Sequence, residues 1–431
     1  MLIQFNFKNF KSFRDEVSLD LTATKITEHE DHVAEAANDK LLKVAAIYGA
    51  NASGKSNVYD AFEYMTYYVD ESFKFGDEEE RRRKTGDSYL KVTPFFFDES
   101  SRDEETTFEV FYVDNSEDTG KTYQYGFSLK KDEVVEEWLY SKAKTARNKY
   151  RTIFYRKKGE ELEMNGFSKN HVENIKASLN KESLIVSLGA KLRIARLKKV
   201  RDWFLSNEIV NFGDPAENFF LSGVLPEGFV ERKEVQDNVV EYFASFDEAI
   251  QDFNIEELSQ EGEKDNSKRY KIEALHKMGG SGEMASIPLK QESSGTLKMF
   301  ALYPSLKEVL DQGSTLFIDE LNARLHPLLV RNIILTFLSP EINTRNAQLV
   351  FTTHDIWQFS NELLRRDEIW MVNKNWDGVS ELYSLVEFKD EAGNKVRRDE
   401  ALAKNYLTGS YGAIPALKPM KMLKGRAADG K

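Results

Sequence analysis

Residues 49–56 read GANASGKS and match the phosphate-binding pattern G-x-x-x-x-G-K-[ST] at every fixed position. The apolar segment 42–48 before them predicts a short strand, and residues 57–65 predict the helix that follows. A loop between a strand and a helix presents backbone N–H groups and the positive end of a helix dipole to an anion. A surface turn rich in Gly and Ser could match by chance, but its strand and helix neighbours favour a phosphate-binding loop in an α/β fold.

The polar residues of this loop suit a nucleotide and a divalent cation. Lys55 would reach the β- and γ-phosphates, and the Ser56 hydroxyl would ligate Mg²⁺. Glycines allow the backbone to approach phosphate closely because they carry no Cβ. We therefore expect ATP and Mg²⁺ as ligands. The expected nucleotide contacts within this loop are Gly49, Asn51, Ala52, Ser53, Gly54, Lys55, Ser56 and Asn57.

Length and composition bound the class of protein. A chain of 431 residues predicts two domains, or one domain with a large insertion. No apolar run approaches the roughly 20 residues of a membrane span. Cysteine is absent, which excludes disulfides and thiolate metal sites and fits a cytoplasmic protein. The net charge of −12 argues against a surface coated by nucleic acid, while a local basic patch remains compatible with it.

The N-terminal part of the chain has the pattern of an antiparallel sheet. Apolar and polar residues alternate over residues 1–21, which predicts a β-hairpin. Four further segments alternate with period two and are rich in aromatic residues, which predicts a β-meander beside the nucleotide site. These segments are residues 94–97, 107–113, 123–129 and 134–140.

A polar loop is expected at residues 25–41. His29 and His32 lie there beside carboxylates and could ligate a metal ion. A solvated, charged loop without metal is the interpretation that the pattern favours.

Two basic segments follow the meander. Residues 141–160 interleave Lys and Arg with aromatic residues, and residues 191–201 form a basic amphipathic pattern within a region, about 168–275, that reads as helical. Basic and aromatic side chains together can bind DNA or RNA through phosphates and bases. An exposed hairpin and a surface helix are the alternatives.

Two later strands each end in residues suited to phosphoryl transfer. The apolar segment 314–318 leads into Asp319, which can hold the Mg²⁺ that Ser56 also holds, and Glu320, which can polarise the attacking water. The apolar segment 348–353 leads into His354, which can donate a hydrogen bond to the γ-phosphate. We expect Glu320, His354 and Lys55 to be the catalytic residues.

A second anion site is predicted where another helix begins. Ser293, Ser294 and Gly295 open a helix, whose N-terminus favours an anion. An ordinary serine N-cap would explain this segment alone. One chain has little use for two phosphate sites far apart in sequence, so we expect the second site to close over nucleotide bound by another copy. This predicts a two-fold homodimer, or a higher oligomer built on it.

The motifs together resemble one family. The segments GANASGKS, ESSGT, LFIDEL, LHP and VFTTHD are similar to those of ABC-type ATPases of the SMC and RecF group, and differ from the transporter branch. The segment NFKSF at residues 9–13 resembles the opening hairpin of that group. The ending, residues 405–415, resembles prokaryotic AAA-family defence ATPases of the RloA and AbiL type, relatives of the OLD family.

This resemblance implies an ABC/SMC-head-like P-loop NTPase core with an N-terminal antiparallel β lobe and a mainly helical insertion. Residues 1–135 would form the N-terminal half of the core, and residues 286–416 the C-terminal half. Residues 136–285 would be an inserted basic hairpin and helical region. Residues 417–431 would be a disordered basic tail.

The resemblance also implies a function. Such a chain would be an ATP-hydrolysing sensor or scaffold in bacterial anti-phage (abortive infection) defence, dimerising on ATP and controlling an effector encoded nearby, such as a TOPRIM-type nuclease. A RecF/SMC-like DNA-binding repair ATPase is the alternative. An OLD-like nuclease in its own right is disfavoured, because no acidic cluster resembling its metal site follows His354.

The chain departs from the family pattern at several positions. Glu292 stands where transporters usually carry leucine, and no Q-loop glutamine occurs near residues 93–95. Arg324 lies in the loop after Glu320, where it could sense a partner's nucleotide or simply lie on the surface.

Overall fold

A computed structural model describes residues 1–75, 91–114, 120–145, 149–214, 216, 225–246, 249–258, 270–280, 282–390 and 392–414. The tail expected at 417–431 lies outside these residues. Within the described residues, no helix is both long enough and apolar enough to cross a bilayer.

A six-stranded sheet forms the core of the nucleotide-binding half. Its strand order is β11-β15-β16-β5-β17-β18, parallel except for the antiparallel edge strand β18. Every residue of β5, β15 and β16 is buried, as expected for parallel strands with both faces covered. The bounds are β5 Val44–Gly49, β11 Glu208–Asn211, β15 Thr315–Asp319, β16 Gln348–Thr353, β17 Ile369–Lys374 and β18 Ser380–Ser384.

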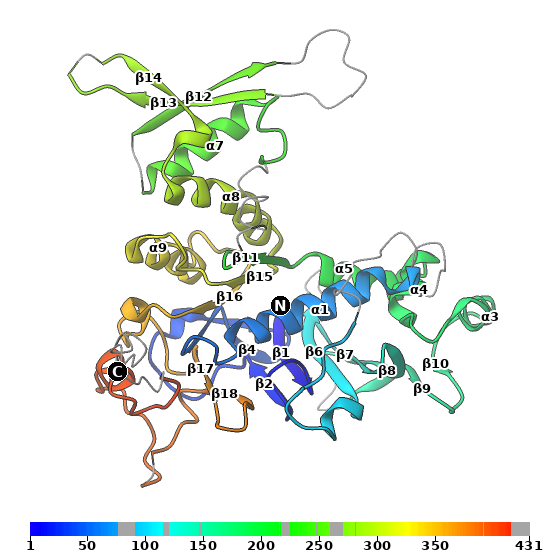
Figure 1. The fold of residues 1–431 in the computed structure, drawn as a ribbon. Helices are drawn as coiled ribbons and strands as arrows, with labels where there is room; N and C mark the ends of the chain where they lie inside the picture. The colour runs from blue at the N-terminus through cyan, green and yellow to red at the C-terminus, as the bar shows by residue number, and fades with distance from the viewer. Residues whose placement is uncertain are drawn as a thin grey trace, which may run out of the picture.

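Helices cover the two faces of this sheet, because apolar side chains alternate along each strand. Ala45 and Ile47 of β5 pack in the cluster that includes α1 (Lys55–Glu71). Val44, Ala46 and Tyr48 pack in the opposite cluster, with α8 (Ser294–Gln312) and α9 (Pro327–Leu338). The helix that carries the phosphate-binding Lys55 and the helix that begins at Ser293 therefore lie on opposite faces (Figure 1).

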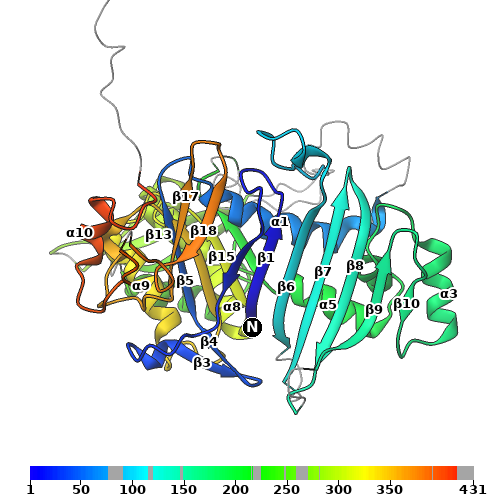
Figure 2. The same ribbon diagram turned by 90° about the horizontal axis from the view of Figure 1, so that it is seen from below.

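A seven-stranded antiparallel sheet packs beside α1, and its order is β10-β9-β8-β7-β6-β1-β2 (Figure 2). The predicted hairpin of residues 1–21 is confirmed by the pairing of β1 with β2. The meander is confirmed for β6, β7 and β8. The bounds are β1 Leu2–Lys8, β2 Val17–Asp20, β6 Thr106–Asp114, β7 Lys121–Lys130, β8 Glu133–Lys142, β9 Arg151–Lys157 and β10 Glu163–Met164. A separate two-stranded hairpin joins β3 (Val33–Ala36) and β4 (Asp39–Leu42).

The strand predicted at Pro94–Phe97 is wrong. This segment is a loop held by the turn after β1: the Phe95 N–H donates to Asn9 Oδ1 at 3.0 Å, and the Lys11 N–H donates to the Thr93 carbonyl at 2.8 Å. The loop binds this turn instead of pairing with a strand of the sheet.

The region between the two halves of the core is mixed. Helices form where the pattern predicts them, namely α3 (Lys169–Ser178), α4 (Ile185–Lys191), α5 (Ala195–Leu205) and α7 (Lys233–Ala244). The helical pattern expected as far as residue 275 is wrong after α7, where a three-stranded antiparallel sheet forms and stands at the top of Figure 1. Its strands are β12 (Ile250–Glu257), β13 (Tyr270–Lys277) and β14 (Met284–Pro288). Strands β12 and β13 contain Glu and Lys residues, which favour helices when tertiary contacts are ignored.

This region also contributes to both larger sheets. Strand β11 pairs with β15 in the core sheet, and the expected boundary at residue 135 falls inside β8. The division into halves and insertion therefore does not coincide with the edges of the sheets.

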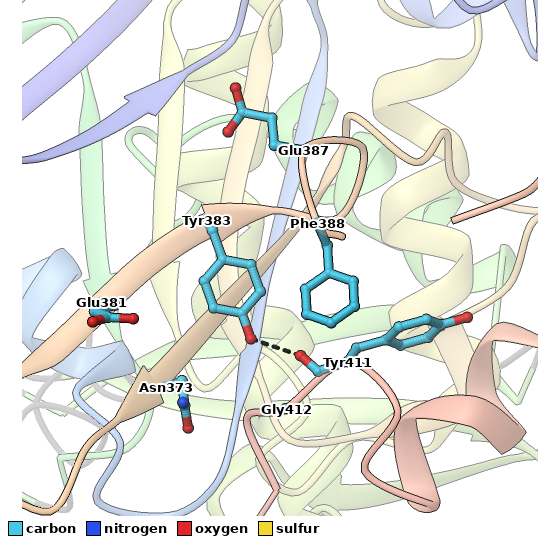
Figure 3. A pocket seen from close by; sticks show the side chains of 7 residues that line it. All are labelled: Asn373, Glu381, Tyr383, Glu387, Phe388, Tyr411 and Gly412. Atoms are coloured by element: carbon cyan, nitrogen blue, oxygen red, sulfur yellow. Dashed lines mark hydrogen bonds between the residues drawn. The ribbon is translucent and has the colours of Figure 1, made fainter. Parts of the chain in front are cut away.

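The C-terminal segment packs onto the edge of the core sheet. Helix α10 (Leu402–Leu407) is followed by a turn in which the Tyr411 carbonyl accepts a hydrogen bond from the Tyr383 hydroxyl of β18 at 2.7 Å (Figure 3). The rings of Tyr383 and Phe388 stack beside this contact and line a cavity of about 310 Å³. The C-terminal segment around Tyr411 therefore packs against strand β18 of the core sheet.

Candidate nucleotide-binding site

The phosphate-binding loop runs from the end of β5 to the start of α1, as the motif predicts. Gly54 is the N-cap of α1 and has φ of 113°, which L side chains rarely adopt. A Cβ at Gly54 would lie 2.6 Å from the hydroxyls of both Ser12 and Ser380, and one at Gly49 would lie 2.4 Å from the Val372 carbonyl. Neither position has room for a side chain, so both glycines are required by the packing of neighbouring elements.

Lys55 is buried inside the loop. Its Nζ donates to the carbonyls of Gly49 at 2.8 Å and Ala50 at 3.0 Å. Burial lowers the pKa of Lys55, while the nearby carboxylates of Glu320 and Asp319 oppose this shift. The cation is therefore held in the loop and lies within electrostatic reach of both strand-end carboxylates.

The loop has polar groups that fit a phosphate. The Ser53 hydroxyl is buried and has no hydrogen-bond partner in the described part of the chain. Asn51, Ala52 and Ser56 are exposed, and Asn57 is half-buried with its amide donating to the Ser12 hydroxyl at 2.6 Å. An unpartnered buried hydroxyl beside a helix N-terminus fits an anionic ligand that accepts hydrogen bonds.

Asp319 and Glu320 lie at the end of β15. Asp319 is only 3% exposed and accepts a hydrogen bond from the Thr352 hydroxyl of the neighbouring β16. The same hydroxyl accepts from the Glu320 N–H at 2.9 Å. Glu320 has φ of 52°, a backbone conformation that is uncommon in residues other than glycine. A Cβ at Gly213 would lie 3.3 Å from the Glu320 side chain, so the chain after β11 packs against it.

His354 follows β16 and is exposed. Its Nε2 lies 3.1 Å from Asn322 Nδ2, and Asn322 Oδ1 accepts from the Thr353 hydroxyl at 2.8 Å. The loop after β15 is therefore tied to the end of β16. Because β5, β15 and β16 are parallel neighbours, their carboxyl ends bring Lys55, Glu320 and His354 to one edge of the sheet.

The second predicted anion site lies on a different segment. Ser293 is the N-cap of α8 and its hydroxyl accepts from the Thr296 N–H at 3.1 Å, while Ser293 and Ser294 are exposed. Among the described residues, no hydrogen bond or ion pair joins residues 293–295 to the phosphate-binding loop. Glu292, which departs from the transporter pattern, lies 2.7 Å from His276 of β13 and ties this segment to the three-stranded sheet.

Sequence reasoning missed Lys298, one turn into α8. It is 2% exposed, and its Nζ donates to the carbonyls of Leu321 at 2.9 Å and Ala323 at 2.6 Å. The cation also lies 3.9 Å from the centre of the Phe212 ring, and burial lowers its pKa to about 7. The sequence does carry a signal for Lys298. It stands three and four residues before the apolar Ala301 and Leu302, so a helix places it on the same, buried face.

Arg324 is exposed and has φ of 60°. Its carbonyl would lie 3.5 Å from a Cβ at Gly295, so the loop after β15 borders the start of α8. This loop therefore contacts both the exposed serine segment and, through Asn322, the end of β16.

The expectation that both histidines of the 25–41 loop are solvated is wrong for His32. His32 is buried, its Nδ1 lies 3.1 Å from the carboxylate oxygens of Glu368, and its ring stacks on His29 at 4.7 Å. Candidate metal-ligand atoms of His29, Asp31 and His32 lie within 4.8 Å of one another. His29 Nε2, however, lies 2.7 Å from the Asn361 carbonyl, so this cluster ties the loop to the segment before β17.

The match to a protein-family model agrees with an ATPase domain. Residues 44–356 match the family model described as "AAA domain, putative AbiEii toxin, Type IV TA system". None of the curated proteins compared with the chain matches it. Among solved structures 46 chains match. One is titled "Structure of the recombination mediator protein RecF-ATP in RecFOR pathway"; it is 16% identical, with a TM-score of 0.35, and the match covers 89% of this chain and 97% of that one.

Proposed function

The chain belongs to this family of AAA-domain ATPases, and we propose that it is a Mg²⁺-dependent ATP phosphohydrolase that dimerises when it binds ATP. The observation that carries the proposal is the convergence of Lys55, Asp319 and Glu320 at one edge of the core sheet. A buried cation and two carboxylates beside a phosphate-binding loop are the groups that phosphoryl transfer to water needs.

Each residue of the proposed active site has its own task. Lys55 and the N–H groups of the loop bind the β- and γ-phosphates, and Glu320 accepts a proton from the attacking water. His354 donates to a γ-phosphate oxygen, and Asn322 positions its ring. Ser56 and Asp319 would hold Mg²⁺, which supplies charge neutralisation at the phosphates when it is bound.

The proposed dimer rests on the segment Ser293–Gly295, in which both serines are exposed. This segment begins a helix of 19 residues, so it offers unpaired N–H groups and a serine hydroxyl to an anion. We propose that it closes over nucleotide held on the phosphate-binding loop of a second copy. Each of the two sites would then contain residues from both chains, as two-fold symmetry requires.

We propose that this ATPase acts in defence against phage. The matching family is described by a toxin of a type IV toxin–antitoxin system, and the sequence motifs resemble those of abortive-infection ATPases. In this proposal the ATP-bound dimer controls a separate effector, a nuclease of the TOPRIM type or similar. The chain would act in the cytoplasm, where a protein without cysteine fits the reducing environment.

Turnover and assembly test this proposal together. The purified chain is expected to release phosphate from ATP only when Mg²⁺ is present, and Lys55→Ala is expected to abolish that release. Purification together with the product of the neighbouring gene, followed by weighing of the complex, tests effector control. Absence of Mg²⁺-dependent turnover both alone and in that complex would overturn the enzymatic assignment.

A further inference from the structure

A second cavity, of about 440 Å³, lies where β7 begins, β8 ends and β9 begins, next to α5. These elements lie far from the C-terminal helix α10 (Figures 1 and 2), and the cavity brings together the two basic segments of the sequence, residues 141–160 and 191–201. Among the described residues, four cations and no carboxylate line it. The lining cations are Lys121, Lys149, Arg151 and Arg196.

The cations of this cavity differ from neighbouring basic residues in their partners. Within the described chain, Lys121, Lys149 and Arg151 make no ion pair. By contrast, Lys198 pairs with Asp202, Lys199 with Asp114 and Arg201 with Asp70. The outer charges of α5 are therefore already neutralised, and the unpaired positive charge gathers in the cavity. A protein with net charge −12 has carboxylates in excess, which makes their absence here informative.

The geometry around Arg196 is fixed by its neighbours. Its guanidinium donates to the Asn165 carbonyl at 2.8 Å and lies 5.4 Å from the centre of the Phe167 ring. Asn165 is itself held, because its amide donates to the Thr152 carbonyl and to Glu163. This carboxylate, which lies near the cavity, is thus engaged by an amide and does not line it.

A β-bulge lies next to Thr152, which lines the cavity. The pairing of β8 with β9 shifts between Leu139 and Tyr140, so one extra residue of β9 is left unpaired next to Thr152. Such bulges redirect side chains and occur often beside functional sites. The aromatic ring that contacts a cation of the cavity is that of Phe167, which lies against Arg196.

We propose that this cavity binds the phosphodiester backbone of a single strand of nucleic acid. Its volume of about 440 Å³ is in the range of sites that hold a small ligand or part of a larger one. Exposed Lys144, between the lining residues Ala143 and Thr145, adds positive charge at the border of the cavity, which suits a polymer more than a single phosphate. Unpaired cations beside an aromatic ring, here that of Phe167, are the combination that sequence-independent strand binding uses. The inference goes beyond the ATPase proposal and does not depend on it.

Binding of a labelled strand of about 16 nucleotides, followed by fluorescence anisotropy, tests the proposal. The double variant Lys149→Glu, Arg151→Glu reverses two exposed charges that make no ion pair in the described chain. We expect its dissociation constant to rise on the order of tenfold, and the slope of log affinity against log salt to fall by about 1.4. The matched control is Lys389→Glu, Lys395→Glu, which makes the same charge change near the C-terminal segment and is expected to bind like the wild type.

Four outcomes would overturn the proposal: no strand binding by the wild type, equal loss in the control, unchanged binding by the cavity variant, or competition by a mononucleotide as strong as by the strand. Binding of an acidic protein in place of the strand would reassign the cavity. ATP binding, measured on the same preparations, shows that the cavity variant is folded. Failure of ATP binding in the wild type would count against the ATPase proposal alone.

Discussion

The ammonium of Lys298 donates a hydrogen bond to the Ala323 carbonyl at 2.6 Å, and so joins the helix that begins at Ser293 to the loop that follows Glu320. The same ammonium donates a second hydrogen bond to the Leu321 carbonyl, at 2.9 Å, so two bonds connect the helix to the loop. The exposed serine segment and the proposed catalytic carboxylate are therefore mechanically connected within one chain. Any movement of α8 on meeting a partner's nucleotide would act on this loop.

Replacement of Lys298 by methionine tests the connection. The variant keeps the length of the side chain but leaves two buried carbonyls without their donor, at a cost of about 1–3 kcal/mol each. We expect kcat to fall by about tenfold or more while the affinity for ATP stays near that of the wild type. Lys298→Arg should recover part of the rate, because it restores a donor. An unchanged kcat in Lys298→Met would show that the connection made by Lys298 does not affect turnover.

Loss of the loop cation should weaken nucleotide binding strongly. Lys55 is the buried cation of the phosphate-binding loop, and charged hydrogen bonds of this kind contribute about 1.5–3 kcal/mol each. We expect Lys55→Ala to weaken ATP binding on the order of a hundredfold, measured by calorimetry. The exposed Lys40→Ala serves as the control and should bind normally. Equal affinities in both variants would contradict the assignment of the loop.

An arginine in place of Ser293 should prevent dimerisation without weakening the binding of ATP. Ser293 is exposed and caps α8 but makes no contact that holds the core together. We expect Ser293→Arg to bind ATP as the wild type does, to stay monomeric and to lose turnover. Ser178→Arg, on exposed helix α3, is the matched control. An ATP-bound dimer of Ser293→Arg, seen by light scattering, would argue against the composite site.

The features that could be predicted from the sequence are those whose residues are contiguous in the chain. The phosphate-binding loop and the strand that ends in Asp319 are contiguous motifs, so their elements were predictable. The role of Thr352, which bonds Asp319 from a strand 33 residues away, depends on strand order and leaves no local pattern. Lys298 reads as an ordinary helix charge until its carbonyl partners are known.

The same limit explains the errors in the middle of the chain. Strands β12 and β13 carry many charged residues, and the register of β12–β14 is set by pairing with one another, so a local pattern misreads them. The sequence pattern leaves the basic stripe of α5 free for a ligand, whereas three of its cations are paired with aspartates: Lys198 within the helix, and Lys199 and Arg201 with residues of other elements. Ion pairing across elements decides which charges remain free.

Stability should depend on pH through Glu137 of β8. This carboxylate accepts from the N–H groups of Ile185 and Val186 at the start of α4, and burial raises its pKa to about 7. A folded pKa above the unfolded value means that the folded state holds more protons between the two values. The stabilisation of the folded state by Glu137 is therefore fully present below pH 4.5, the ordinary pKa of a glutamate. It is lost as the pH rises through about 7, the pKa of Glu137 in the folded protein.

Urea unfolding of Glu137→Gln measures this contribution. Between pH 6 and pH 8, the free energy of unfolding of the wild type should fall by about 1–2 kcal/mol more than that of the variant. Glu160→Gln, an exposed control, should follow the wild type. Identical pH profiles for Glu137→Gln and the wild type would show that Glu137 does not titrate in this range.

The mass of Glu320→Gln in Mg²⁺ and ATP tests the central claim most directly. The amide cannot accept a proton from water, so hydrolysis stops while the loop and the Ser293 segment stay intact. Light scattering should give twice the mass of one chain when ATP is present, and the mass of one chain when it is absent. A single-chain mass at an ATP concentration that saturates the site, with turnover unchanged, would contradict both the composite site and the role of Glu320.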